Sequence, residues 1–149
     1  MTHTLTRRMA LTALGAGLAL PAKAESLFLD GLGVAIKGYD PVAYFEYEEA
    51  VRGKLDFELE TEEGNWWFAR ERHREKFAAD PDRFTPQFGG FDAEGMARGF
   101  KRRSDPTLWV MIDNRIYLHY TVEDQNRWAQ DIRLNIEMAE DHWETLKSL

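Results

Sequence analysis

The segment Pro86-Gln87-Phe88-Gly89-Gly90-Phe91-Asp92-Ala93 constrains the fold of this chain more than any other. Two adjacent glycines indicate backbone angles that other residues adopt with difficulty, or the close approach of another group to bare backbone. A proline and two phenylalanines surround the glycine pair, and helix-compatible sequence stands on both sides. We therefore expect a fixed, irregular backbone segment between two helices.

The first 24 residues have the features of a bacterial export signal. Arg7-Arg8 precedes an uncharged run from Ala10 to Leu20, and Ala22-Lys23-Ala24 has the small-x-small pattern of a cleavage site. Because the run is too short for a permanent anchor, we expect cleavage after Ala24, no membrane insertion of the mature chain and a periplasmic location. The paired arginines favour the twin-arginine (Tat) route, with the Sec route as the alternative.

The mature chain expected from Glu25 onward is acidic and contains no cysteine. All 26 acidic residues lie in it, whereas three of the 19 Lys and Arg residues leave with the signal, so its net charge is −10. This charge argues against nucleic acid and anionic lipid as partners and favours solubility or cationic partners. The lack of cysteine excludes disulfides, thiolate metal ligands and thiol nucleophiles.

The apolar pattern predicts a single small α+β domain over residues 25–149. Leu55, Phe57 and Leu59 alternate with acidic residues, which predicts a strand with one buried face, and Trp66-Trp67-Phe68 is the expected returning strand of an antiparallel hairpin. A second hairpin is predicted around Asp113-Asn114, a pair suited to a tight turn. The remaining expected elements are a short strand at 34–36, a short helix after Asp40-Pro41, a helix at 71–79 that Asp80-Pro81 ends, a short helix at 81–84 and a helix at 93–100 with Gly99 as its stop. A solvated basic loop is expected at 101–103. Thr121 is the expected cap of a helix through Trp128, with Asp124 completing an imperfect capping box, and the last helix at 132–147 has a core face of Ile132, Ile136, Ala139 and Trp143.

Three blocks of the mature chain together resemble the periplasmic, Tat-exported branch of the YHS-domain family. They are Tyr39-Asp40-Pro41-Val42-Ala43-Tyr44-Phe45, the aromatic strand and helix from Trp67 to Phe84, and Pro86-Gln87-Phe88-Gly89-Gly90-Phe91. The resemblance covers most of residues 25–149 and implies a YHS-type domain in the periplasm. Wider YHS domains resemble small metal-binding modules, so the resemblance also implies metal handling, with copper or zinc as the ion.

The cysteines that the resemblance would place in this chain are all replaced. The expected thiolate positions hold Ala43, Ala69 and His73, and Asp92 stands where this branch has a cysteine after the glycine pair and its aromatic neighbour. What the resemblance implies is therefore a YHS fold that has lost its thiolate ligands.

Three residues are candidate metal ligands. His73 is the strongest, because imidazole can replace a thiolate on zinc or copper; the alternative is a partly exposed helix histidine between two arginines. Asp92 can coordinate a hard cation or cap the helix that follows it, and the sequence favours capping. His119 shares one side of its strand with Tyr117, which favours a structural role near the core over metal ligation.

A metal-independent binding module is the alternative function. Its pocket would combine aromatic side chains with a few polar groups beside the glycine pair, as ligand sites tend to do. The predicted ligand-binding residues are Tyr39, Asp40, Tyr44, Gln87, Gly89, Gly90, Phe91 and Asp92, with Phe88 and Trp109 as further lining. The same aromatic residues can instead form an ordinary core.

An enzyme is the third interpretation. The sequence has no phosphate loop, dinucleotide fingerprint or zinc-protease helix, and its mature serines lie near the chain ends or in a polar loop. A hydrolase that uses Asp40 and Asp92 as an acid and base pair stays open. The sequence therefore predicts a periplasmic, non-catalytic binding or accessory protein whose partner is a metal ion, a small ligand or a periplasmic protein.

Overall fold

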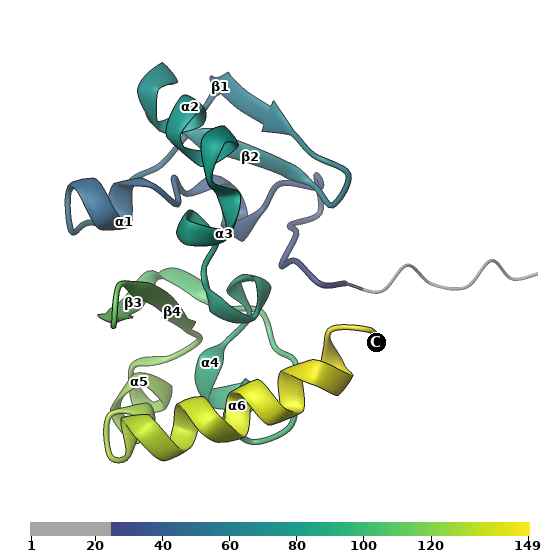
Figure 1. Ribbon diagram of the computed structural model, residues 1–149, viewed down its shortest axis with the longest axis vertical. Coiled ribbons are helices and arrows are strands. Elements are labelled where there is room, and N and C mark those ends of the chain that lie inside the picture. The colour runs from purple at the N-terminus through teal and green to yellow at the C-terminus, as the bar shows by residue number, and fades with distance from the viewer. Residues whose placement is uncertain (1–24) are drawn as a thin grey trace, which may run out of the picture.

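The computed structural model describes residues 25–149, and the predicted export signal at 1–24 lies outside these residues. The described chain is an α+β domain with six α-helices and two antiparallel two-stranded sheets, which confirms the predicted fold class. In Figure 1 the first hairpin and helices α1 to α3 form the upper part, and the second hairpin with α4 to α6 forms the lower part. No helix between residues 25 and 149 has the length and apolarity needed to cross a bilayer.

The first hairpin pairs β1 (Lys54–Glu60) with β2 (Asn65–Phe68). Its strands form where the alternating pattern predicts them, but the expected buried face is incomplete. Phe57 and Leu59 pack against the core, whereas Leu55 is 65% exposed. The pairing shifts register between Lys54 and Glu58, so the start of β1 leaves the regular ladder and Leu55 has no layer to pack against.

The segment predicted as a strand at 34–36 is not one. Val34 and Ala35 make only isolated bridges, and Ile36–Gly38 forms the short 3-10 helix η1. Ile36 and Lys37 have φ angles of 43° and 55°, which are incompatible with an extended strand. Three helices follow in the upper part: α1 (Ala43–Glu46), α2 (Glu71–Ala79) and α3 (Pro81–Phe84).

The lower part begins with η2 (Gln87–Gly90) and α4 (Ala93–Ala97), followed by β3 (Asp105–Ile112), β4 (Arg115–His119), α5 (Val122–Trp128) and α6 (Ile132–Leu146). Asp113 and Asn114 both have positive φ, so the predicted tight turn of the second hairpin is confirmed. Helix α4 ends at Ala97 with Arg98 as its C-cap, and Gly99 follows with a φ of +85°, so the predicted stop at Gly99 is confirmed. The capping box of α5, built from Thr121 and Asp124, is present.

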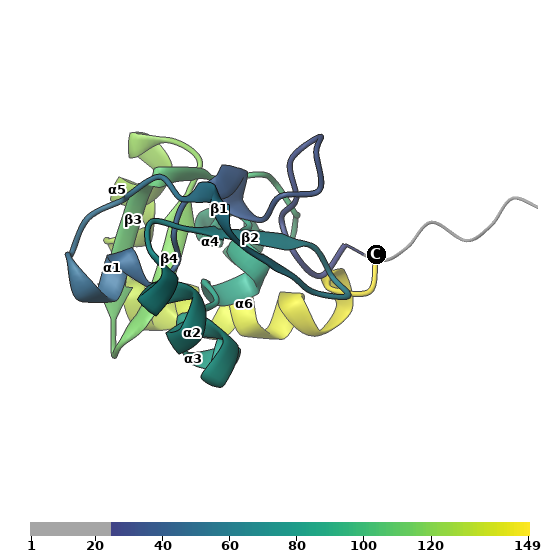
Figure 2. The same ribbon diagram turned by 90° about the horizontal axis from the view of Figure 1, so that it is seen from above.

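One hydrophobic cluster joins the two parts of the domain. Phe68 and Phe77 of the upper part, and Leu118 and Trp128 of the lower part, belong to the same group of buried side chains. The view from above shows the first hairpin partly overlying the lower part (Figure 2). Helix α6 adds Ala139 as a buried residue, whereas its first predicted core residue, Ile132, is 38% exposed at the helix start.

Candidate functional site

The glycine pair allows a close crossing of two backbone segments. Gly89 and Gly90 have φ angles of +61° and +80°, and the carbonyl of Gly89 accepts a hydrogen bond from the amide of Phe28 at 2.8 Å. A Cβ atom on Gly89 would lie 1.9 Å from the carbonyl oxygen of Ser26, and one on Gly90 would lie 2.5 Å from the side chain of Ile36. The backbone requirement predicted for this segment is therefore confirmed.

Asp40 is a buried carboxylate that accepts hydrogen bonds from four donors. Its Oδ1 accepts hydrogen bonds from the amides of Val42 (2.9 Å) and Ala43 (3.2 Å), and its Oδ2 accepts from the amide of Ala69 (2.7 Å). The fourth donor is Nδ1 of His73, 2.6 Å from Oδ2. Positions 43, 69 and 73, which the YHS resemblance assigns to ligands, thus converge on Asp40.

His73 is 2% exposed, so the alternative of a partly exposed helix histidine is wrong. Because a carboxylate only accepts hydrogen bonds, Nδ1 of His73 carries the proton, and Nε2 is the nitrogen that can bind something else. Among the described residues, the ring nitrogens that are both fully buried and without a hydrogen-bond partner belong to His119 and Trp128. Nε2 of His73 has no partner there either, so it is not fully buried and reaches the surface. The ring of Tyr47 lies beside the imidazole at 5.2 Å.

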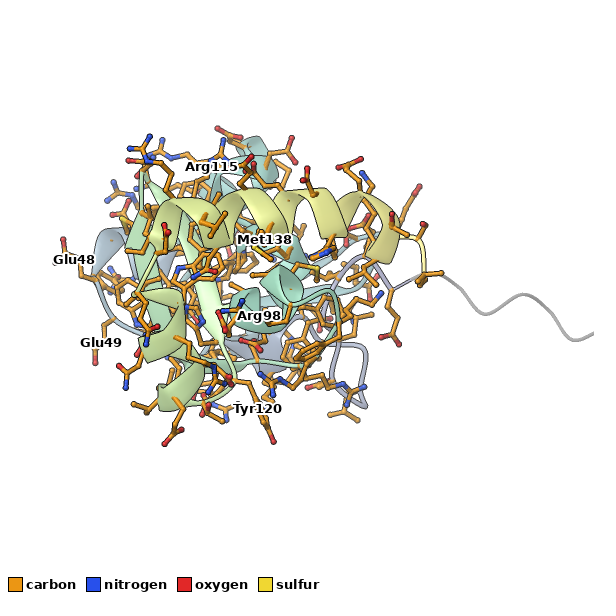
Figure 3. The ribbon with its side chains drawn as sticks, turned by 90° about the horizontal axis from the view of Figure 1, so that it is seen from below. Glu48, Glu49, Arg98, Arg115, Tyr120 and Met138 are labelled. Carbon is orange, nitrogen blue, oxygen red and sulfur yellow. The ribbon has the colours of Figure 1, made fainter. Side chains whose placement is uncertain are left out.

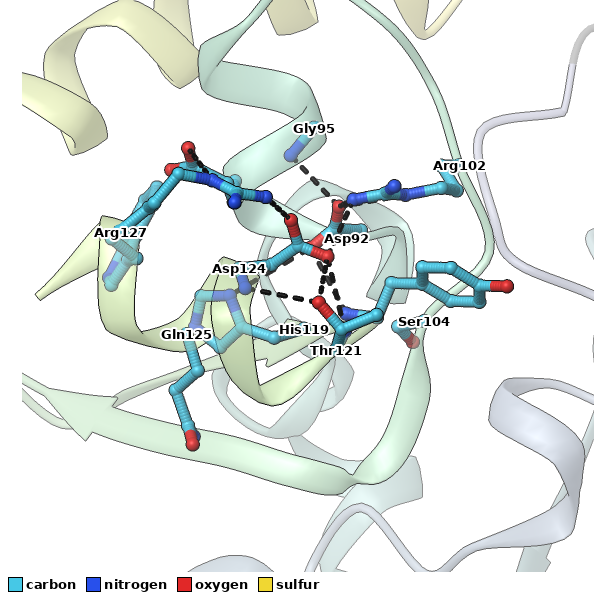
Figure 4. A network of polar contacts seen from close by, with 12 residues as sticks. Asp92, Gly95, Arg102, Ser104, His119, Thr121, Asp124, Gln125 and Arg127 are labelled. Atoms are coloured by element: carbon cyan, nitrogen blue, oxygen red, sulfur yellow. Dashed lines mark hydrogen bonds and ion pairs between the residues drawn. The ribbon is translucent and has the colours of Figure 1, made fainter.

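Asp92 stands at the centre of a second buried network, drawn in Figure 4. It caps helix α4 by accepting from the amide of Gly95 at 2.9 Å, and it accepts from Nε and Nη2 of Arg102 at 3.1 and 2.5 Å. The amide of Tyr120 donates to its other oxygen at 3.2 Å. Burial raises the pKa of Asp92, and the hydrogen bonds and charge of Arg102 oppose that rise. The capping role predicted for Asp92 is confirmed.

Arg102 contradicts the prediction of a solvated basic loop at 101–103. Its guanidinium joins Asp92 to Asp124, with Nη2 also donating to Asp124 at 2.8 Å. Burial alone would raise the pKa of Asp124, but the hydrogen bond from Thr121 and the positive charges of Arg102 and Arg127 lower it. Two buried carboxylates explain why this arginine is drawn inward, since an unpaired buried charge is strongly unfavourable.

His119 lies beside this network without joining it. It is fully buried, its Nδ1 is 3.8 Å from Oδ1 of Asp92, and its ring packs 5.5 Å from that of Trp128. Neither of its ring nitrogens has a hydrogen-bond partner in the part of the chain that the structure describes. Burial lowers the pKa of His119 to about 4. Between residues 25 and 149, no group of three or more His, Asp or Glu side chains is arranged to hold a metal ion.

The predicted ligand-binding residues are distributed over several places. Tyr44 is buried and donates its hydroxyl to the carbonyl of Pro106 at 2.8 Å, and Phe91 is part of the core. Tyr39 is half-buried under the guanidinium of Arg52. The structure brings Asp40 to His73 and Asp92 near His119, but the two aspartates share no hydrogen-bond partner among the described residues. Of the predicted ligand-binding residues, Gln87 lines two hollows that are open to the surface.

Two hollows meet at Gln87 and Phe88. The first hollow, of about 510 Å³, lies between the β1–β2 turn, helices α2 and α3, and η2, with Trp66 and Phe77 also in its lining. The second hollow, of about 420 Å³, lies between η2 and helix α6, with Trp143 in its lining. Both volumes fall in the range of small-ligand sites.

No pattern in the sequence predicts these hollows. Their walls come from the β1–β2 turn, α2, α3, η2 and α6, which are far apart along the chain. The one local sequence feature that lies at both hollows is Gln87-Phe88, next to the glycine pair. A third hollow, of about 450 Å³, lies at the β3–β4 turn and the start of α6, where Ile112, Ile132 and Ile136 line it.

Comparisons with protein-family models, curated proteins and solved structures find no match to this chain. The resemblance to YHS domains therefore stays a prediction. The site is defined by its geometry alone: a carboxylate-held histidine at Asp40 and His73, a buried ion-pair network at Asp92, and the two hollows on either side of Gln87 and Phe88.

Proposed function

We propose that this protein is a non-catalytic binding or accessory protein, and that its ligand surface is the pair of hollows beside Gln87 and Phe88. The observation that supports this most directly is that two hollows of small-ligand size share the same two residues. A ligand that crosses Gln87 and Phe88 would contact both hollows at once. This is the metal-independent binding module predicted from the sequence, as distinct from metal handling.

Ligand screening by NMR tests this proposal. Amide shifts of the labelled protein would be followed while a library of small neutral, anionic and cationic fragments is added. We expect binding fragments to shift amides within 61–63, 81–88 and 140–144. Gln87→Trp should block these shifts, because an indole there fills the shared edge, whereas Gln130→Trp in the exposed turn after α5 should leave them unchanged. Shifts that gather elsewhere, or that survive Gln87→Trp, would contradict the proposal.

Metal handling is the second candidate, supported by the contact between Asp40 and His73. A carboxylate that holds one imidazole nitrogen commonly orients the other nitrogen toward a metal. Here Nδ1 of His73 is held at 2.6 Å and Nε2 reaches the surface. Copper or zinc would raise the melting temperature if it binds the folded protein selectively. His73→Gln should abolish that rise and His142→Gln should preserve it; equal shifts in the three proteins would exclude His73 as the ligand.

Hydrolysis by Asp40 and Asp92 receives no support from the geometry, because each carboxylate is enclosed in its own network. Action in the periplasm remains part of the proposal through the predicted signal. Fractionation of cells and sequencing of the protein's first residues would test it, with a mature chain beginning at Glu25 as the expected result. Export should fail when Arg7 and Arg8 are both changed to lysine if the Tat route is used.

A further inference from the structure

The two hollows carry one sign of charge. Every charged side chain in their lining is acidic, with three in the first hollow and three in the second. These residues are Glu62, Glu63 and Asp82, and Glu140, Asp141 and Glu144. A concave surface lined by carboxylates without a basic residue attracts cations and repels anions. The occupant of the hollows should therefore be positively charged.

The charges of this surface are only partly balanced by neighbours. Glu140 lies 3.6 Å from Arg115, which projects beside helix α6 in Figure 3, and Glu144 pairs with Lys147 at 2.8 Å. Exposed pairs of this kind contribute little and exchange readily. Asp82 and Asp141 are exposed and make no ion pair within residues 25–149. Each hollow thus has one carboxylate that is available for an incoming cation.

Aromatic side chains form the floor of both hollows, but Trp66, Phe77 and Phe88 are buried in the core at 3%, 1% and 6% exposure. Trp66 and Phe77 lie in contact in the first hollow, with ring centroids 4.7 Å apart. Phe88 belongs to both hollows and lies 6.1 Å from Trp143, which is half-buried in the second. A lysine or arginine side chain suits the second hollow, because its alkyl stem can pack on the half-buried Trp143 while its charged head pairs with a carboxylate; in the first hollow the carboxylates carry the attraction.

The shared edge suits a peptide backbone. The side-chain amide of Gln87 is half-buried and makes no hydrogen bond to the described residues, so it has both a donor and an acceptor to offer. An extended peptide advances about 3.3 Å per residue, so nearby side chains can reach hollows that meet at a common edge. On the basis of the proposed binding function, we propose that the occupant is an extended segment of a protein partner with two basic side chains, one in each hollow.

Calorimetric titration with designed peptides tests this proposal. The probe is a capped peptide with two lysines separated by two glycines, and the comparison ligands are the same peptide with one lysine, its counterpart with two glutamates, and 1,5-diaminopentane. At low salt we expect saturable binding of the two-lysine peptide, at least about tenfold weaker binding of the one-lysine peptide, and no binding of the glutamate peptide. Added sodium chloride should weaken the binding.

Charge-matched variants separate a specific site from general attraction to an acidic protein. Asp82→Asn with Asp141→Asn removes one carboxylate from each hollow, and Asp56→Asn with Glu123→Gln removes the same charge from exposed positions elsewhere. We expect the first pair to weaken peptide binding at least about tenfold and the second pair less than about twofold. Circular dichroism and unfolding curves should show that both double variants remain folded.

Three results would overturn the proposal: no saturable binding of the two-lysine peptide, equal losses in the two double variants, or tighter binding of 1,5-diaminopentane than of the peptide. The last result would identify a small organic cation as the occupant. If neutral fragments bind the hollows and the lysine peptide does not, the binding function stands and the peptide proposal fails. If neither kind of ligand shifts amides of the hollows, both proposals fail.

Discussion

Replacing His119 by glutamine should remove most of the histidine-dependent loss of stability between pH 7.5 and pH 5. His119 is fully buried in the folded protein, and neither ring nitrogen has a hydrogen-bond partner among the described residues. Burial disfavours the charged imidazolium and lowers the pKa to about 4, from an ordinary value of 6.5. The folded state therefore keeps this histidine neutral over a pH range in which the unfolded chain protonates it.

The sign and size of the effect follow from linkage. Above pH 6.5 the histidine is neutral in both states and has no effect, and as the pH falls toward 4 the unfolded state binds a proton that the folded state does not. Stability therefore falls as the pH falls through this window. At pH 5, which is about 1.5 units below 6.5, the loss is about 2 kcal/mol at about 1.36 kcal/mol per unit.

Urea unfolding at pH 7.5 and pH 5 measures this loss directly. The difference between the two free energies of unfolding should be about 2 kcal/mol larger in the wild type than in His119→Gln. Carboxylates that titrate near pH 5 are present in both proteins, so they contribute to both differences. His142→Gln, which changes a half-buried histidine on α6, is the matched control and should keep the wild-type difference.

NMR titration of the imidazole gives a second, independent test that does not require the variant to fold. The wild-type His119 signals should report a pKa near 4. Equal pH differences in wild type and His119→Gln, together with a wild-type His119 pKa at or above its ordinary value, would refute the reasoning. Such a result would mean that the imidazolium is accommodated in the core, with Asp92 as the nearest carboxylate at 3.8 Å.

Other substitutions test the backbone, the ion-pair network and a helix cap through urea unfolding. Gly89→Ala should destabilise by at least about 2 kcal/mol, because it adds a Cβ against backbone at a positive φ, whereas Gly31→Ala, which meets nothing within 4 Å, should stay within about 0.5 kcal/mol of wild type. Arg102→Met should cost about 3 kcal/mol by leaving two buried carboxylates without their shared cation, and the exposed control Arg133→Met should change little. Thr121→Ala should cost about 1 kcal/mol through loss of the α5 cap. A small loss of stability in Gly89→Ala would contradict the close backbone crossing. A loss in Arg102→Met no larger than in Arg133→Met would contradict the bridging role of Arg102, and no loss in Thr121→Ala would contradict the helix cap.

Local signals made much of the secondary structure predictable. The hairpin turn at Asp113-Asn114, the Asp80-Pro81 boundary between α2 and α3, and the capping box at Thr121 all lie within a few residues of the structure they specify. Each rests on a short-range rule of turn or cap chemistry, so the chain need not be folded to reveal it. The strand expected at 34–36 is absent because Ile36 and Lys37 have positive φ angles, which an extended strand does not allow, and no local pattern in the sequence predicts them.

The candidate site was less predictable, because its parts meet only in the folded chain. The sequence identifies Asp40 and His73 separately as candidates, but their contact depends on the approach of the segment before α1 to the start of α2. The charge run at 101–103 predicts a solvated Arg102, since nothing in the sequence reveals that Asp92 and Asp124 are buried together beside it. A local pattern gives the residue type and the element, whereas burial and partners are set by distant segments.

The sequence by itself determined that Gly89 and Gly90 form an irregular turn between helices, because only glycine avoids a Cβ at the crossing that this turn makes with Ser26. It also determined the class of fold, through alternation, turns and caps. Only the tertiary structure decided that the turn presents Gln87 and Phe88 to two acidic hollows. The physical reason is that a hollow is made by side chains from elements remote in sequence, and their approach is governed by the packing of the whole core.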